Sequence, residues 1–127
     1  MVLITFTINY KTEYGQKVQV VGNIPELGNW NGGIDLVPYE NNIWKVTAIV
    51  HTLPFEYKFK IVESNTNKVI RWEFLENNTN RMFCLNKQAD QIELEITWER
   101  PEDTKQTITM ARVLKSAIKK SCSKDVL

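Results

Sequence analysis

The sequence predicts an all-β domain, an antiparallel β-sandwich of about seven strands with the immunoglobulin-like arrangement. Apolar residues recur at every second position over several stretches, which is the period of a strand with one buried face. Residues that favour turns separate these stretches at short intervals. Short strands at this spacing are typical of two packed sheets.

In chain order, the expected strands cover residues 2–9, 18–22, 44–50, 55–62, 69–72, 81–85 and 92–99. The alternation is clearest in the first of them, where Val2, Ile4, Phe6 and Ile8 occupy one face. The strands over residues 55–62 and 92–99 follow the same rule. Turn signals fall at residues 14–15, 32–33, 40–42, 54, 65–67 and 76–80.

The pattern changes after Pro101, so we place the sandwich in residues 1–100 and a basic C-terminal segment in residues 101–127. Apolar and basic residues then interleave at helical intervals, which favours an amphipathic helix over residues 109–120. A short isolated helix is marginal in water. A solvated linker is therefore an equal alternative for this segment.

Charge and composition exclude several classes of function. The chain carries 16 basic and 15 acidic side chains, a net charge of +1, which gives no field for binding nucleic acid. From Lys105 onward six basic residues face one aspartate, a net charge of +5. No apolar run is long enough to span a membrane. The two cysteines, Cys84 and Cys122, make neither a disulfide framework nor a metal site, which favours a reducing, cytoplasmic location.

The most informative stretch is VQVVGNIPELGNWN, residues 18–31, because a strand ends at Gly22 and a run of turn residues then leads to Trp30. Ile24 and Leu27 can anchor such a loop to the body of the domain. A tryptophan carried on an anchored loop is unlike a core residue. We interpret it as part of a binding surface.

This stretch, together with FEYKF at residues 55–59, Trp72-Glu73 and Asn80-Arg81, resembles the starch-binding domains, which are carbohydrate-binding modules of family 20. The resemblance covers residues 2–98 and implies a non-catalytic module that binds α-1,4-linked glucans: starch, glycogen, maltooligosaccharides or cyclodextrins. It also implies the immunoglobulin-like sandwich. The IPELG insertion favours the starch-binding type over a related glycogen-binding family.

The resemblance implies a first glucan site, in which Trp30 and Trp72 stack on the C–H faces of adjacent sugars. Lys58 would donate to sugar hydroxyls, since its position has the opposite parity from the apolar residues of its strand. Glu73 and Asn80 would meet the rim of the sugars. The loop of residues 74–79 is longer than usual for the family, so Asn77 or Asn78 can take the place of Asn80.

A second glucan site follows from the same resemblance and comprises Tyr14, Tyr39 and Trp44. Trp44 shares parity with Val46, Ala48 and Val50, so a core position is nearly as well supported. Trp72 likewise shares parity with Ile70, which leaves an inward position open for it.

An enzyme is disfavoured, because the sequence has one histidine, His51, and no nucleophile elbow or phosphate loop. We therefore expect no cofactor and no metal. The alternative function is a scaffold that binds a protein through the sandwich surface or the basic segment, and an attached catalytic domain or a protein partner stays open. The nature of the glucan and the number of sites are also open.

Overall fold

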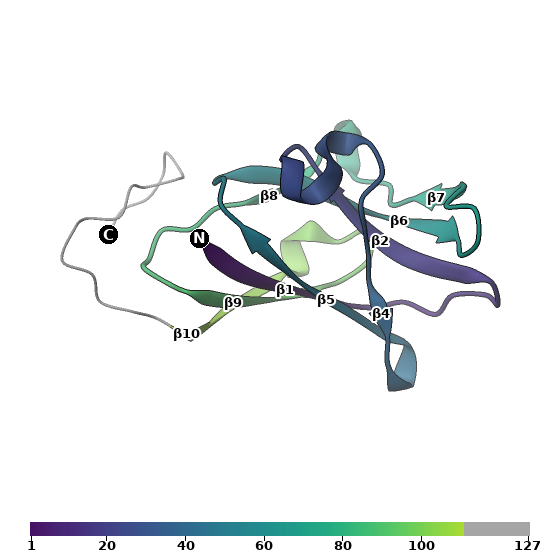
Figure 1. Ribbon diagram of the computed structural model, residues 1–127, viewed down its shortest axis with the longest axis horizontal. Helices are drawn as coiled ribbons and strands as arrows, with labels where there is room; N and C mark the ends of the chain where they lie inside the picture. The colour runs from purple at the N-terminus through teal and green to yellow at the C-terminus, as the bar shows by residue number, and fades with distance from the viewer. Residues whose placement is uncertain (111–127) are drawn as a thin grey trace.

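The computed structural model describes residues 1–110, which form two packed β-sheets (Figure 1). The first sheet has the order β10-β9-β1-β5-β4, and the second has the order β3-β2-β6-β7 with β8 paired to β6. The first sheet comprises β1 (Val2–Asn9), β4 (Val37–Pro38), β5 (Ile43–Val50), β9 (Gln91–Ile96) and β10 (Lys105–Met110). The second comprises β2 (Gln16–Gly22), β3 (Ile34–Asp35), β6 (Phe55–Glu63), β7 (Val69–Trp72) and β8 (Arg81–Phe83). Four 3₁₀ turns connect strands: η1 (Pro25–Trp30), η2 (Glu40–Asn42), η3 (Glu76–Asn78) and η4 (Pro101–Asp103).

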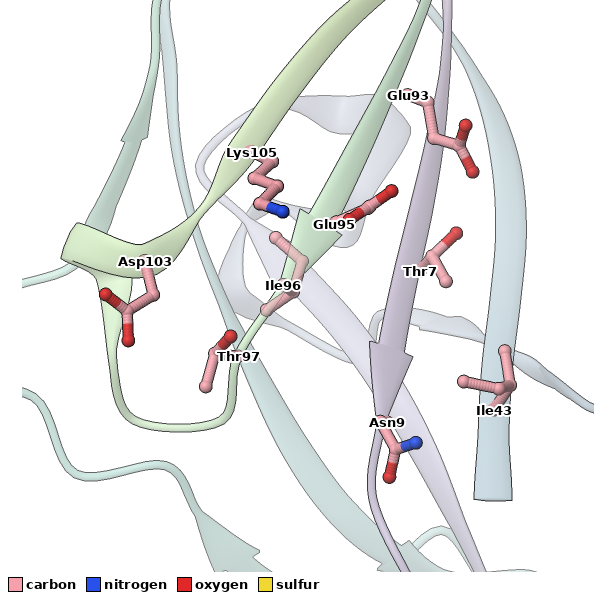
Figure 2. Close-up of a pocket in the computed structure, with 9 residues that line it drawn as sticks. All are labelled: Thr7, Asn9, Ile43, Glu93, Glu95, Ile96, Thr97, Asp103 and Lys105. Atoms are coloured by element: carbon pink, nitrogen blue, oxygen red, sulfur yellow. The ribbon is translucent and has the colours of Figure 1, made fainter. Parts of the chain in front are cut away.

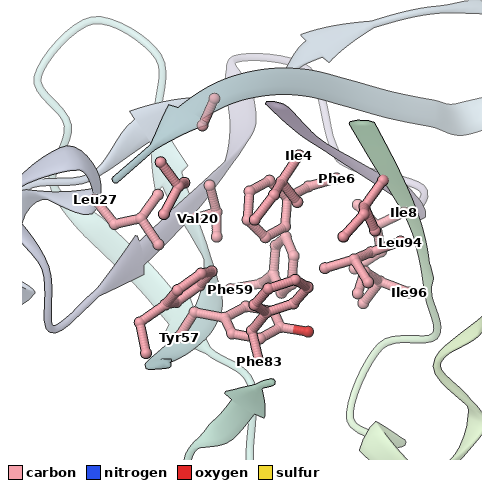
Figure 3. Close-up of a cluster of buried hydrophobic side chains, with 14 of the residues drawn as sticks. Ile4, Phe6, Ile8, Val20, Leu27, Tyr57, Phe59, Phe83, Leu94 and Ile96 are labelled. Carbon is pink, nitrogen blue, oxygen red and sulfur yellow. The ribbon is translucent and has the colours of Figure 1, made fainter. Parts of the chain in front are cut away.

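The core lies between the two sheets and is built from the alternating apolar residues of the long strands (Figure 3). Phe6 of β1 is fully buried and meets two aromatic rings of β6 edge-on, with centroids 5.5 Å away for Tyr57 and 6.2 Å away for Phe59. Phe55 and Phe83 stack at 5.1 Å and join β6 to β8. The predicted sandwich is confirmed, and burial of this apolar set is its main source of stability.

Two features of the first sheet differ from the sequence prediction. β9 pairs with β1 in parallel, so this sheet is mixed and not wholly antiparallel. β10 pairs antiparallel with β9, which carries the sheet past the expected boundary at residue 100. This strand has a weak signal in the sequence, since Ile108 is the one strongly apolar side chain of its first five residues. Most of the helix predicted over residues 109–120 lies outside the described residues.

The outer face of the second sheet is unusual because part of it is buried. Val21 and Val62 point away from the core, yet neither is accessible to solvent. Gly33, in the loop after η1, passes so close to Val21 that a Cβ on this glycine would lie 3.2 Å from the valine Cβ. This loop therefore covers one end of the outer face of the second sheet.

Candidate functional site

The loop between β2 and β3 is tied to the body of the domain by apolar and polar contacts. Leu27 is fully buried in the core. Gly22 lies so close to the Glu56 carbonyl oxygen that an added Cβ would be 2.5 Å from it, so the strand must end in glycine. The Glu26 carboxylate accepts a hydrogen bond from the backbone N–H of His51 at 2.8 Å, and this bond holds the pKa of Glu26 below its ordinary value. The loop is thereby held in one conformation.

This anchored loop presents Trp30 in an unusual backbone conformation. Gly28, Asn29 and Trp30 have φ values of 87°, 52° and 65°, and only the first is a glycine. The left-handed region is strained for a bulky residue. The backbone N–H of Asn31 donates to the Gly28 carbonyl at 2.8 Å and closes the turn, and 37% of Trp30 is exposed. Strain maintained around a half-exposed tryptophan indicates a positioned side chain.

The register of the second sheet places this loop beside Lys58. Val21, which lies under Gly33, is directly opposite Lys58 in the pairing of β2 with β6. Paired residues share a face of a sheet, so Lys58 points outward, as the sequence predicted. The end of the loop and the lysine therefore occupy the same outer face.

Trp72 lies on this outer face as well. It pairs with Lys60, and 40% of its surface is exposed, so the inward alternative is wrong. The Lys60 ammonium lies 5.0 Å from the centroid of the Trp72 ring, a cation–π contact that orients the indole. Burial lowers the pKa of Lys60. Sequence reasoning missed Lys60, although its parity with Lys58 in β6 was a signal.

Glu73 does not reach the rim of the site, in contrast to the sequence prediction. It is 1% exposed and forms a bidentate ion pair with Arg81, with Oε1 to Nε at 2.8 Å and Oε2 to Nη2 at 2.9 Å. Oε1 also accepts the backbone N–H of Phe59 at 3.0 Å, and Oε2 accepts that of Glu99 at 3.1 Å. Four donors leave the carboxylate no free position for a sugar hydroxyl.

The buried ion pair has a positioning role at the point where β6 changes partners. Residues 55–57 of β6 pair with β8, and residues 60–62 pair with β7. Arg81 also donates to the Thr97 carbonyl at 2.8 Å and to the Thr104 hydroxyl at 3.1 Å. Trp72 immediately precedes Glu73, so this network fixes the backbone that carries the indole.

Asn80 remains available at the surface. It is exposed, and its Nδ2 donates to the Glu56 carboxylate at 3.0 Å. Asn80 directly precedes Arg81, which pairs with Tyr57 of β6, so Asn80 lies next to Lys58 in the register. The structure thus brings Lys58, Trp72 and Asn80 to neighbouring positions of the outer face, together with the loop that carries Trp30.

The second set of predicted residues does not form one platform. Trp44 is 6% exposed and belongs to the core, where its Nε1 donates to the Tyr10 carbonyl at 3.1 Å. The core alternative for Trp44 is therefore correct, because its pairing with Ile8 turns it inward. Tyr14 is fully exposed and Tyr39 is 57% exposed, with the Lys45 ammonium 5.4 Å from the Tyr39 ring centroid. Of these three predicted residues, Tyr14 and Tyr39 have rings that are accessible to a ligand.

A concavity of about 390 Å³ lies on the opposite side of the molecule, over the first sheet (Figure 2). It is lined by Thr7, Asn9, Ile43, Glu93, Glu95, Ile96, Thr97, Asp103 and Lys105. This lining has no aromatic ring to cover a sugar face. The tryptophan face and this hollow are therefore separate features.

The outer face of the second sheet offers apolar plates and hydrogen-bonding groups. Residues 1–110 contain no cluster of His, Cys, Asp and Glu able to hold a metal ion. Within the same range, no helix is long and apolar enough to cross a membrane. The outer face of the second sheet can stack on flat apolar surfaces and hydrogen bond to hydroxyl groups around them.

Comparison with known proteins gives a consistent result. The model of a family described as the starch-binding domain matches residues 1–92. A glucoamylase of Neurospora crassa is 34% identical over 105 residues, 76% of this chain and 16% of the relative. A thermophilic β-amylase of Thermoanaerobacterium thermosulfurigenes is 37% identical over 83 residues, 60% of this chain and 14% of the relative. The chain thus spans about a sixth of the length of these curated relatives.

Solved structures agree on the fold. A glycoside hydrolase family 15 glucoamylase from Hypocrea jecorina superposes with a TM-score of 0.66 at 28% identity, covering 77% of this chain and 17% of that chain. The family 20 carbohydrate-binding module of a maltotetraose-forming amylase from Pseudomonas saccharophila superposes with a TM-score of 0.56 at 24% identity, covering 65% and 88%. The second likeness supports the β-sandwich alone.

Proposed function

This chain belongs to the starch-binding domain family, and we propose that it binds α-1,4-linked glucans on the outer face of its second sheet. The observation that carries the proposal is the pair of half-exposed tryptophans, Trp30 and Trp72, held by an anchored loop and by a buried ion pair. Each ring covers the C–H face of one sugar. Lys58 and Asn80 meet the hydroxyls at the rim of the sugars.

Selectivity follows from the shape of the ligand. An α-1,4 chain curves, so adjacent sugars present faces at an angle, whereas a β-1,4 chain is extended and flat. Two plates on different supports, a loop and a strand, suit the curved chain. The affinity comes from aromatic area, and the selectivity comes from the relative placement of the plates.

The family module is a non-catalytic binding domain, whereas the relatives named above are enzymes many times longer. We propose that these 127 residues bind polysaccharide and perform no catalysis, and that they direct an attached enzyme or partner to it. Glu26, Asp35 and Glu73 are occupied in structural hydrogen bonds.

Co-sedimentation tests the proposal. The chain should sediment with insoluble starch and stay in solution with cellulose, because the flat chain cannot cover both tryptophans. Trp30→Ala should lose more than about tenfold in affinity for starch, which is about 1.4 kcal/mol. Ile49→Ala is the control, since Ile49 is 52% exposed on the first sheet. Equal retention on starch and cellulose would overturn the proposal.

A further inference from the structure

Phe74 is a third aromatic ring beside the two tryptophans, and its exposure has no explanation in the packing. It is 69% exposed, the highest value for any large apolar residue of the second sheet and the loops that adjoin it except Tyr14. Its neighbours in the chain, Glu73 and Leu75, are 1% and 2% exposed. Alternation from Trp72 to Leu75 therefore places Phe74 on the same outer face as Trp72.

The backbone that carries Phe74 is held on both sides. The N–H of Glu73 donates to the Phe59 carbonyl at 3.1 Å, and the N–H of Phe74 donates to the Glu99 carboxylate at 2.8 Å. The next residue, Leu75, is buried. A ring on such a segment loses little conformational freedom when it binds a ligand, since its main chain is already ordered. This is a property of a binding plate.

The register links Phe74 to the rest of the site. Trp72 pairs with Lys60, and the Glu73 N–H donates to the Phe59 carbonyl, so the chain follows β6 as far as Glu73 and Phe74 is the first residue beyond that pairing. Two residues along an extended chain span about 7 Å, a distance comparable to one sugar ring with its hydroxyls. Trp72 and Phe74 therefore lie at successive positions along one line of the surface.

We propose that Phe74 extends the glucan site by stacking on a sugar beyond those covered by Trp30 and Trp72, so that the domain prefers longer chains. This inference rests on the proposed function. Phe74 belongs to the loop of residues 74–79, which joins β7 to β8 and returns at Asn80, so the extension is continuous with the site. A protein partner is the less favoured occupant, because hydroxyl-binding groups such as Lys58 and Asn80 lie among the rings.

The experiment compares a short and a long ligand. Isothermal titration with maltotriose and with maltoheptaose should show that Phe74→Ala weakens maltoheptaose binding about three- to tenfold and changes maltotriose binding less than twofold. Phe74→Leu should behave like Phe74→Ala, because a branched side chain is not a flat plate, and Phe74→Trp should retain or strengthen the long-chain affinity. Ile49→Ala, at a site 52% exposed on the first sheet, is the control and should change neither.

The results separate this inference from the proposed function. If the wild-type domain binds neither sugar, the proposed function fails and the inference fails with it. If the wild-type domain binds both sugars and Phe74→Ala alters maltoheptaose binding less than twofold, only the inference fails. An equal loss for the two sugars, or a Phe74→Leu variant that binds maltoheptaose normally, also overturns it. If the domain bound neither sugar but bound a protein partner, and Phe74→Ala weakened that binding, Phe74 would belong to a protein interface instead.

Discussion

The two outward faces of the sandwich have the same alternating backbone and different chemistry. At the centre of the first sheet, Thr5 and Thr47 face each other with 2.7 Å between their hydroxyl oxygens, and Glu93 lies beside Thr5 in the register. On the second sheet the outward positions include Trp72 and the buried Val21. The first face is an ordinary solvated side of a sheet whose other side packs on the core.

The outer face of the second sheet differs, because large apolar rings are exposed to water there, which is energetically unfavourable. Exposed apolar patches of this kind mark binding surfaces. Their supports are buried polar groups, above all the Glu73–Arg81 pair, which holds the strand that carries Trp72. On the second sheet, the exposed Trp72 and the buried ion pair that supports it are therefore adjacent in the chain.

The largest expected effect breaks the support of the second face. Arg81→Ala leaves the Glu73 carboxylate buried without its counter-ion, and this should lower the free energy of unfolding by about 3–5 kcal/mol. The control is Arg100→Ala, whose ion pair with Asp103 is exposed and whose loss should change the free energy of unfolding little. Urea denaturation measures both. If Arg81→Ala lowered the free energy of unfolding by less than about 1 kcal/mol, the ion pair would not be the rigid support of the second face.

The second prediction contrasts two tryptophans of the same chain. Trp44→Ala removes a core side chain and should lower the free energy of unfolding by about 3–5 kcal/mol. Trp72→Ala removes an exposed plate and its contact with Lys60, so it should cost no more than about 1 kcal/mol of stability. It should nevertheless weaken maltoheptaose binding more than about tenfold. Thermal melting and calorimetry measure the two quantities, and a large fall in Tm for Trp72→Ala would make it a structural residue.

The sequence predicted the strands well because period two survives wherever one face is apolar and the other polar, as in β1. It could not assign Trp72 to a face, since apolar residues stand at both parities of this short strand, Val69 at one and Ile70 and Trp72 at the other. All four residues of β7 are exposed in the structure. Parity distinguishes two sides of a strand without saying which is inside. Trp44 was ambiguous for the same reason and proved to be core.

Glu73 shows a second limit of sequence reasoning. A carboxylate is almost always exposed unless paired, and its partner Arg81 is separated from it by the whole loop between β7 and β8. Burial of this pair depends on Phe59, Thr97 and Glu99, which come from distant segments. Such a network becomes apparent only when the segments are placed in space. Family resemblance identified both residues and gave Glu73 the wrong role.

The third prediction tests how firmly the Trp30 loop is held. Glu26→Gln should lower the free energy of unfolding by about 1 kcal/mol at pH 7, because the charged acceptor for the His51 N–H is lost. The pKa of Glu26 is lower in the folded state than in the unfolded state, so the carboxylate stabilises the fold above the unfolded pKa. This advantage should disappear as the pH falls below about 4.

Urea denaturation at several pH values measures the effect of Glu26→Gln. Glu95→Gln is the control, since Glu95 is exposed on the first sheet, and its substitution should change stability little at any pH. An advantage of the wild type over Glu26→Gln that persisted at low pH would show that packing, and not the charge on Glu26, holds the loop.

The smallest expected effect distinguishes the uncharged plates from the charged parts of the chain. Stacking and hydroxyl contacts involve no release of counter-ions, so affinity for maltoheptaose should change less than twofold between about 50 and 200 mM salt. Deletion of residues 111–127 removes five basic residues and leaves β10 intact, and it should also leave the affinity unchanged. A polyanionic ligand bound by the basic segment would behave differently, since each neutralised charge steepens the salt dependence. Affinity that fell severalfold with salt and vanished on this deletion would move the binding site from the second sheet to the C-terminal segment.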